Sequence, residues 1–60
     1  MDEQFIAYET GRADGIAAHR DEARAEHPTL GRDYRVGFLD GRIEVFRLMA
    51  DLRKIVEDPD

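Results

Sequence analysis

Pro28 divides this chain of 60 residues into two long stretches that contain almost no helix breakers other than glycine. Neither stretch shows the alternating apolar pattern of a strand, so we predict an all-α fold in which Thr29 caps the second helix. Two helices of matched length joined by a short loop favour an antiparallel hairpin. The predicted elements of this single domain, residues 1–60, are a helix over about 3–26, a loop at 27–29 and a helix over about 30–56.

The same eight-residue pattern occurs once in each predicted helix. Tyr8–Gly15 and Tyr34–Gly41 both read Tyr-x-x-Gly-x-x-Asp-Gly, at an offset of 26 residues. A glycine inside a helix costs about 1 kcal/mol relative to alanine, and close approach of two helix backbones can offset that cost. The repeat therefore predicts a helix crossing. Its six residues are Gly11, Gly15, Gly37, Gly41, Tyr8 and Tyr34.

An antiparallel hairpin that turns at Pro28 gives this crossing a definite register. The two repeats are then related by a pseudo-twofold axis, and Gly15 lies opposite Gly41. In the same register we expect Tyr8 over Leu48, and Tyr34 over the turn at residues 22–23.

The second predicted helix carries two apolar stripes on opposite sides. The first helix has few large apolar residues and can cover only one of them. An exposed row of large apolar side chains marks an interface, so we predict a homodimer whose second helices form the centre of a four-helix bundle. A partner helix of another protein is the alternative occupant. One stripe comprises Tyr34, Phe38, Gly41, Val45, Leu48, Leu52 and Ile55, and the predicted interface stripe comprises Val36, Leu39, Ile43, Phe46 and Ala50.

The small size of the chain also favours association. In a domain of this size, burial of apolar surface gains on the order of 90 kcal/mol, and ordering the chain costs about the same. The sequence has no cysteine for a disulfide and only two histidines. A second chain is therefore the most accessible source of additional stability.

Charged side chains border the second helix in two rows. Exposed ion pairs contribute only about 0–1 kcal/mol each, so we interpret the rows as determinants of pairing specificity and solubility. Arg12 occupies the position that Phe38 has in the second repeat, and we expect it either to extend its charged end to solvent or to pair with Glu44. The basic row is Arg35, Arg42 and Arg53, and the acidic row is Asp40, Glu44 and Asp51.

The sequence predicts no catalytic, cofactor-binding or metal-binding residues. It contains neither cysteine nor serine, and its glycines form no phosphate-binding loop after a strand. His19 and His27 lack the His-Glu-x-x-His spacing of a zinc site, and the surrounding charges exclude a membrane span. The net charge of −5 argues against direct binding of nucleic acid, although a mimic of nucleic acid remains open. No secretion signal follows Met1, so we expect a cytoplasmic protein.

The arrangement of these motifs resembles the ribosome modulation factor family and its small bacterial and phage relatives. The resemblance covers about residues 7–46 and implies a two-helix protein that binds the ribosome without catalysing a reaction. Its matching positions are Tyr8, Gly11, Gly15, Pro28, Tyr34, Gly37 and Gly41.

From the sequence we therefore predict a small non-enzymatic regulatory protein. The composition, rich in arginine and alanine, indicates a bacterial or phage gene. The chain is expected to form a homodimer through its second helix and to bind a host or partner protein. A ribosome-associated modulator is the alternative, and an enzyme or metal site assembled between chains is a third reading.

Overall fold

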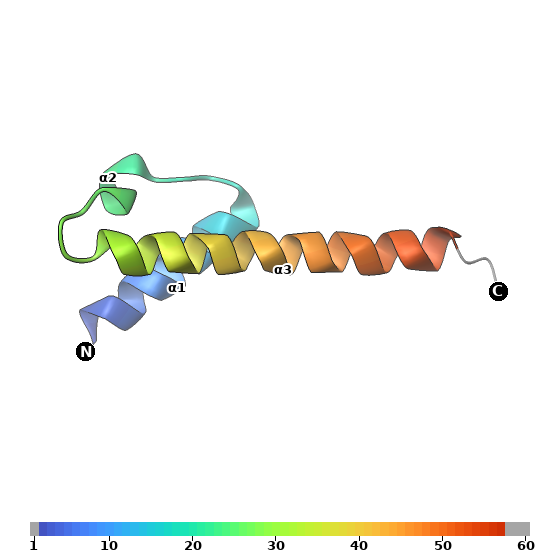
Figure 1. Cartoon of the computed structure of the whole chain (residues 1–60), viewed down its shortest axis with the longest axis horizontal. Coiled ribbons are helices and arrows are strands. Elements are labelled where there is room, and N and C mark those ends of the chain that lie inside the picture. The colour runs from blue at the N-terminus through green and yellow to red at the C-terminus, as the bar shows by residue number, and fades with distance from the viewer. Residues whose placement is uncertain (1, 58–60) are drawn as a thin grey trace.

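The computed structural model describes residues 2–57, and within that range the chain is helical with no strand. Met1 and residues 58–60 of the expected domain lie outside the described residues. The elements are α1 (Glu3–Ala17), α2 (Glu22–Ala25) and α3 (Gly31–Glu57). The long helix α3 packs across α1 and extends well beyond it, which gives an elongated molecule of 50 × 22 × 13 Å (Figure 1).

Helix α1 ends earlier than the sequence predicts. The Asp2 side chain caps its first turn by accepting from the Gln4 N–H at 3.0 Å. At the other end Ala18 adopts the left-handed conformation with φ 57°, and the His19 N–H closes the last turn on the Asp14 carbonyl. The expected helix over 3–26 is therefore wrong, because the chain turns back at Ala18.

A short helix occupies the region that was expected to complete the first helix. Asp21 has extended backbone and caps α2, accepting from the Arg24 N–H at 3.2 Å. The extended backbone of Asp21 thus begins a new helix after α1 has ended at Ala17.

Helix α3 runs parallel to α1, so the expected antiparallel direction is wrong. Tyr8 lies against Gly37 and Arg12 lies against Gly41, so contact partners advance along both helices in the same direction. The connection from Ala18 to Leu30 makes this possible. Its residues outside α2 can each extend by about 3.3 Å, which is enough to span the roughly 22 Å of α1 and return the chain to the start of that helix (Figure 1).

An imidazole, rather than the expected Thr29 hydroxyl, caps the start of α3. His27 Nδ1 accepts from the backbone N–H groups of Thr29 at 3.2 Å and Leu30 at 3.0 Å. Gly31 then packs closely on the carbonyl of Ala25 in α2, and Arg35 donates to the same carbonyl. These contacts fix α2 against the first turns of α3.

Little apolar surface is buried within one chain. Ala25 and Tyr34 are the only buried apolar side chains in residues 2–57. Every residue from Phe46 to Glu57 is exposed. The intramolecular core is thus confined to the half of α3 that crosses α1, and the other half extends as a single helix (Figure 1).

Candidate interaction surface

The four repeat glycines lie at the contact between α1 and α3, and all are buried. A Cβ on Gly11 would overlap the Tyr34 carbonyl, and one on Gly37 would overlap the Tyr8 carbonyl. Gly15 and Gly41 make the matching pair of contacts, with Phe38 and Arg12. Each contact maps onto its counterpart when the two repeats are exchanged. The pseudo-twofold axis therefore runs along the two helices, which is the symmetry of a parallel pair.

The tyrosines of the repeat join the two helices in the same symmetric way. Tyr34 Oη donates to Asp14 Oδ2 at 2.6 Å, and Tyr8 Oη donates to Asp40 Oδ2. Each tyrosine thus bonds the aspartate of the other repeat, an exchange that we did not predict although the repeat contains both residues. The expected position of Tyr8 over Leu48 is wrong because the helices are parallel.

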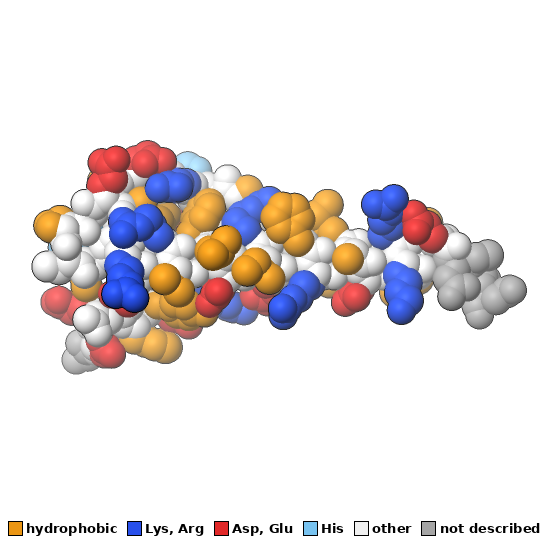
Figure 2. All heavy atoms as spheres, in the orientation of Figure 1, with side chains coloured by type: hydrophobic (Ala, Val, Ile, Leu, Met, Phe, Trp, Pro, Cys, Tyr) orange, Lys and Arg blue, Asp and Glu red, His pale blue; other side chains and the backbone are white. Residues whose placement is uncertain are grey.

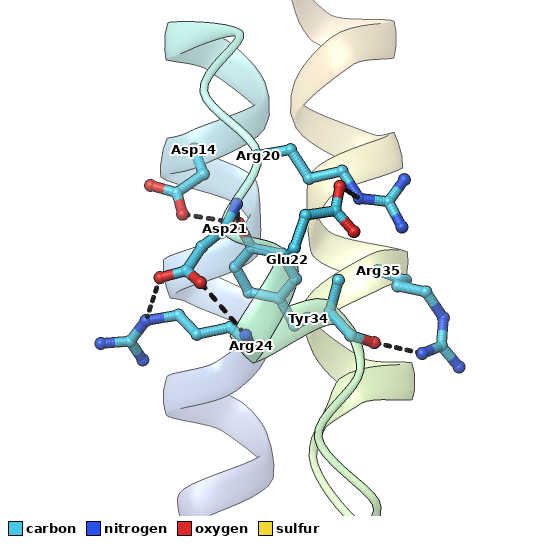
Figure 3. A network of polar contacts seen from close by, with 8 residues as sticks. Asp14, Arg20, Asp21, Glu22, Arg24, Tyr34 and Arg35 are labelled. Atoms are coloured by element: carbon cyan, nitrogen blue, oxygen red, sulfur yellow. Dashed lines mark hydrogen bonds and ion pairs between the residues drawn. The ribbon is translucent and has the colours of Figure 1, made fainter.

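Tyr34 also holds the connection in place. Its hydroxyl accepts from the Asp21 N–H at 2.8 Å, which ties the cap of α2 to the helix crossing (Figure 3). This partner directly precedes the expected residues 22–23, which belong to α2 and not to a turn. Tyr34 is 1% exposed, so both of its hydrogen bonds are shielded from water.

The surroundings of both tyrosines favour the neutral phenol. Burial raises the pKa of Tyr34 above its ordinary value of 10.0, and the hydrogen bond to Asp14 raises it further. The hydrogen bond to Asp40 is the main cause of the raised pKa of Tyr8.

These raised pKa values predict a loss of stability in alkali. A folded-state pKa above the unfolded value gives a contribution that is complete below about pH 10 and is lost as the pH rises through the folded value. We expect the urea midpoint to fall more steeply above about pH 10 in the wild type than in Tyr34→Phe. Equal slopes for the two proteins would show that Tyr34 does not carry this dependence.

Arginines join the two helices on both sides of the crossing. Arg12 Nη2 lies 2.6 Å from Glu44 Oε2, the pairing expected from the sequence. Arg42 donates to the Gly15 carbonyl at 3.3 Å, near the C-terminal end of α1, where a positive charge is favourable. Its guanidinium also lies 5.1 Å from the centroid of the Phe46 ring. Several charges of the two rows therefore bond within the chain.

The predicted interface stripe lies on the side of α3 away from α1. Its four large residues are 39–59% exposed, which places a row of apolar surface in water. Figure 2 shows hydrophobic side chains along the visible face of α3, between basic and acidic ones. We call this surface the back stripe; it consists of Val36, Leu39, Ile43, Phe46 and Ala50.

A second apolar surface covers the part of α3 beyond α1. Among its members Ile55 is 70% and Val56 80% exposed. It lies on the same side of α3 as α1 does, because it continues the heptad positions that α1 covers. We call it the C-terminal seam, and it consists of Leu48, Met49, Leu52, Ile55 and Val56.

One open cavity lies near the start of both long helices. Its volume is about 210 Å³, smaller than the roughly 300–1,000 Å³ typical of sites for cofactors and drug-sized ligands. Tyr34 forms part of its wall. The remaining lining residues are Glu3, Ile6, Ala7, Arg24, His27 and Leu30.

The described part of the chain shows no grouping of His, Cys, Asp or Glu side chains that could hold a metal ion. His19 is exposed, and His27 caps α3. None of the helices within residues 2–57 is both long and apolar enough to cross a membrane. No protein-family model matches the sequence, and no significantly similar curated protein or solved structure was found.

Proposed function

We propose that this chain is a non-enzymatic interaction protein that forms a homodimer through the back stripe and acts by binding a partner protein. The supporting observation is the exposure of Val36, Leu39, Ile43 and Phe46 in one row on α3. Burial of such side chains is worth about 1.5–3 kcal/mol each, so a partner that covers the row gains substantial free energy. In the dimer two α3 helices pack side by side with one α1 outside each, which is a four-helix arrangement.

The total exposed area supports association. The chain exposes 4908 Å², whereas a compact monomer of 6.9 kDa exposes about 4,000 Å². The difference of about 900 Å² is close to the roughly 800 Å² that each partner buries in a standard interface.

We place this protein in the cytoplasm of a bacterium, or of the host cell if the gene belongs to a phage.

Ile43→Asp tests the dimer. A carboxylate at the centre of the back stripe would have to be buried unpaired, so we expect the variant to lose the wild-type association and to show a lower mass in sedimentation equilibrium. Its helical circular dichroism should persist because Ile43 faces away from α1. The matched control is Ile6→Asp, since Ile6 is 43% exposed and Ile43 39%, and Ile6 lies on α1 away from the stripe.

Two outcomes would contradict the proposed dimer. One is a wild-type protein that is folded and monomeric at high concentration. The other is an Ile43→Asp variant with the same mass as the Ile6→Asp control.

Partner binding is tested by co-purification from a bacterial lysate with wild-type and Ile43→Asp baits, followed by mass spectrometry. A protein retained specifically by the wild type binds the dimer or its stripe, whereas one retained equally by both binds elsewhere on the chain. If neither bait retains a specific protein, the partner-binding part of the proposal fails and the dimer remains to be judged by its mass.

A further inference from the structure

The C-terminal seam is a continuation of a surface that already binds a helix. Tyr34 and Gly41 are buried under α1, and the same stripe continues along α3 through Leu48, Leu52 and Ile55. The spacing of four and three residues is unbroken across the end of α1, so a helix that continues in line with α1 would lie on the same side of α3, against large apolar side chains instead of glycines.

The uncovered segment is long enough for a helix of defined size. Helix α3 has 27 residues and α1 has 15. At 1.5 Å per residue their lengths are about 40 and 22 Å, which leaves about 18 Å of α3 beyond the crossing. The occupant should therefore be about 18 Å of helix with one apolar face.

The same segment of a second copy meets both requirements. We propose that residues 46–57 form a second self-association surface, on which the C-terminal seams of two copies pair in antiparallel orientation around Leu52. In this orientation each segment lies beyond the end of the other copy's α1. A parallel pair would instead bring both α1 helices between the two α3 helices.

Side chains on one flank of the seam favour this pairing, and those on the other flank oppose it weakly. Around a twofold axis at Leu52, Met49 of one copy faces Val56 of the second copy, which adds apolar contact. Asp51 lies on the opposite flank and approaches Asp51 of the second copy. Because these carboxylates are exposed, their repulsion is weak.

The C-terminal seam and the back stripe lie on opposite sides of α3, so one partner helix cannot cover both. Two self-complementary surfaces on opposite sides of one helix, each used around its own twofold axis, allow association beyond two chains. The inference thus goes beyond the proposed dimer: we expect assemblies of more than two chains, in which the seam and the stripe act independently.

Three variants separate the two surfaces by mass in sedimentation equilibrium. We expect the wild type to exceed two chains, Leu52→Asp and Ile43→Asp each to stop at two, and the double variant to be monomeric. Ile6→Asp is the control, since it introduces the same carboxylate on α1, away from both surfaces. Circular dichroism checks that each variant remains helical.

The outcomes distinguish the two proposals. If Leu52→Asp has the mass of the wild type, or Ile6→Asp lowers the mass equally, the seam is not an interface. If the single variant Leu52→Asp is a monomer and Ile43→Asp has the mass of the wild type, the seam is an interface and the proposed dimer through the back stripe is contradicted.

Disulfide crosslinking tests the antiparallel orientation. The sequence contains no cysteine, so each introduced cysteine can only pair with its counterpart in another copy. In an antiparallel pair around Leu52, the two Ile55 positions are about 9 Å apart along the axis, too far for a disulfide, whereas the two Leu52 positions are adjacent. We expect Leu52→Cys to form a disulfide-linked dimer on oxidation and Ile55→Cys to remain largely unlinked. Efficient crosslinking of Ile55→Cys would overturn the antiparallel arrangement.

Discussion

Gly37→Ala is expected to remove a large part of the stability of the protein at 25 °C. The added Cβ would lie 2.9 Å from the Arg12 backbone nitrogen and closer still to the Tyr8 carbonyl, and backbone atoms cannot rotate away. Overpacking typically costs 1–3 kcal/mol and more where backbones must separate, so we expect about 3 kcal/mol or more. A domain of this length has about 3–9 kcal/mol of stability in total.

The measurement is urea unfolding followed by circular dichroism at 222 nm. Gly11→Ala should behave like Gly37→Ala because the pseudo-twofold axis gives it the equivalent contact, with the Tyr34 carbonyl. Glu9→Ala, an exposed change on α1, is the control and should alter stability by less than about 0.5 kcal/mol. A Gly37→Ala variant as stable as this control would contradict the close backbone contact.

Tyr34→Phe is expected to have the next largest effect. The substitution removes the hydrogen bond to Asp14 and leaves the Asp21 N–H without its acceptor, both at a site shielded from water. Hydrogen bonds to charged groups contribute about 1.5–3 kcal/mol, so we expect a loss of about 2–3 kcal/mol.

Tyr8→Phe is the matched control, since Tyr8 has the same place in the other repeat. It makes a single hydrogen bond, to Asp40, at a more exposed site. Its loss of stability, measured as the shift in urea midpoint, should be less than half that of Tyr34→Phe. Equal losses of stability in the two variants would mean that neither the burial of Tyr34 nor its hydrogen bond from the Asp21 N–H stabilises the fold further.

The sequence was informative about which residues meet at the crossing and uninformative about the direction of the helices. A repeat at an offset of 26 residues is compatible with a pseudo-twofold axis either across or along the helices. The length of the connection decides between them, and this length depended on where the first helix ends. Because Ala18 is not glycine, its left-handed conformation gave no signal in the residue types.

The pairing of Arg12 with Glu44 is present for a different reason from the one that predicted it. The expectation used the register of an antiparallel hairpin, whereas in the parallel pair the long arginine side chain reaches across the crossing to the next turn of α3. Tyr8 and Asp40 make a bond of the same separation in sequence. A correct contact therefore did not validate the register from which it was derived.

The apolar surfaces of α3 were easier to predict because they depend on helical periodicity alone. The exposure of Leu39 and Phe46 follows from their place opposite α1, whichever way α1 runs. The seam beyond Val45 was expected to lie under the first helix. It is uncovered because α1 ends at Ala17 and crosses only the first half of α3.

The location of both repeats in one chain makes the helix crossing independent of dilution. Two separate helices with this pattern would have to meet by diffusion, whereas a short linker holds its two ends at an effective concentration in the millimolar range. The proposed contacts between chains through α3 would weaken as the protein is diluted. The Tyr8–Asp40 and Tyr34–Asp14 bonds belong to a single molecule and should persist in the most dilute solution in which the chain remains folded.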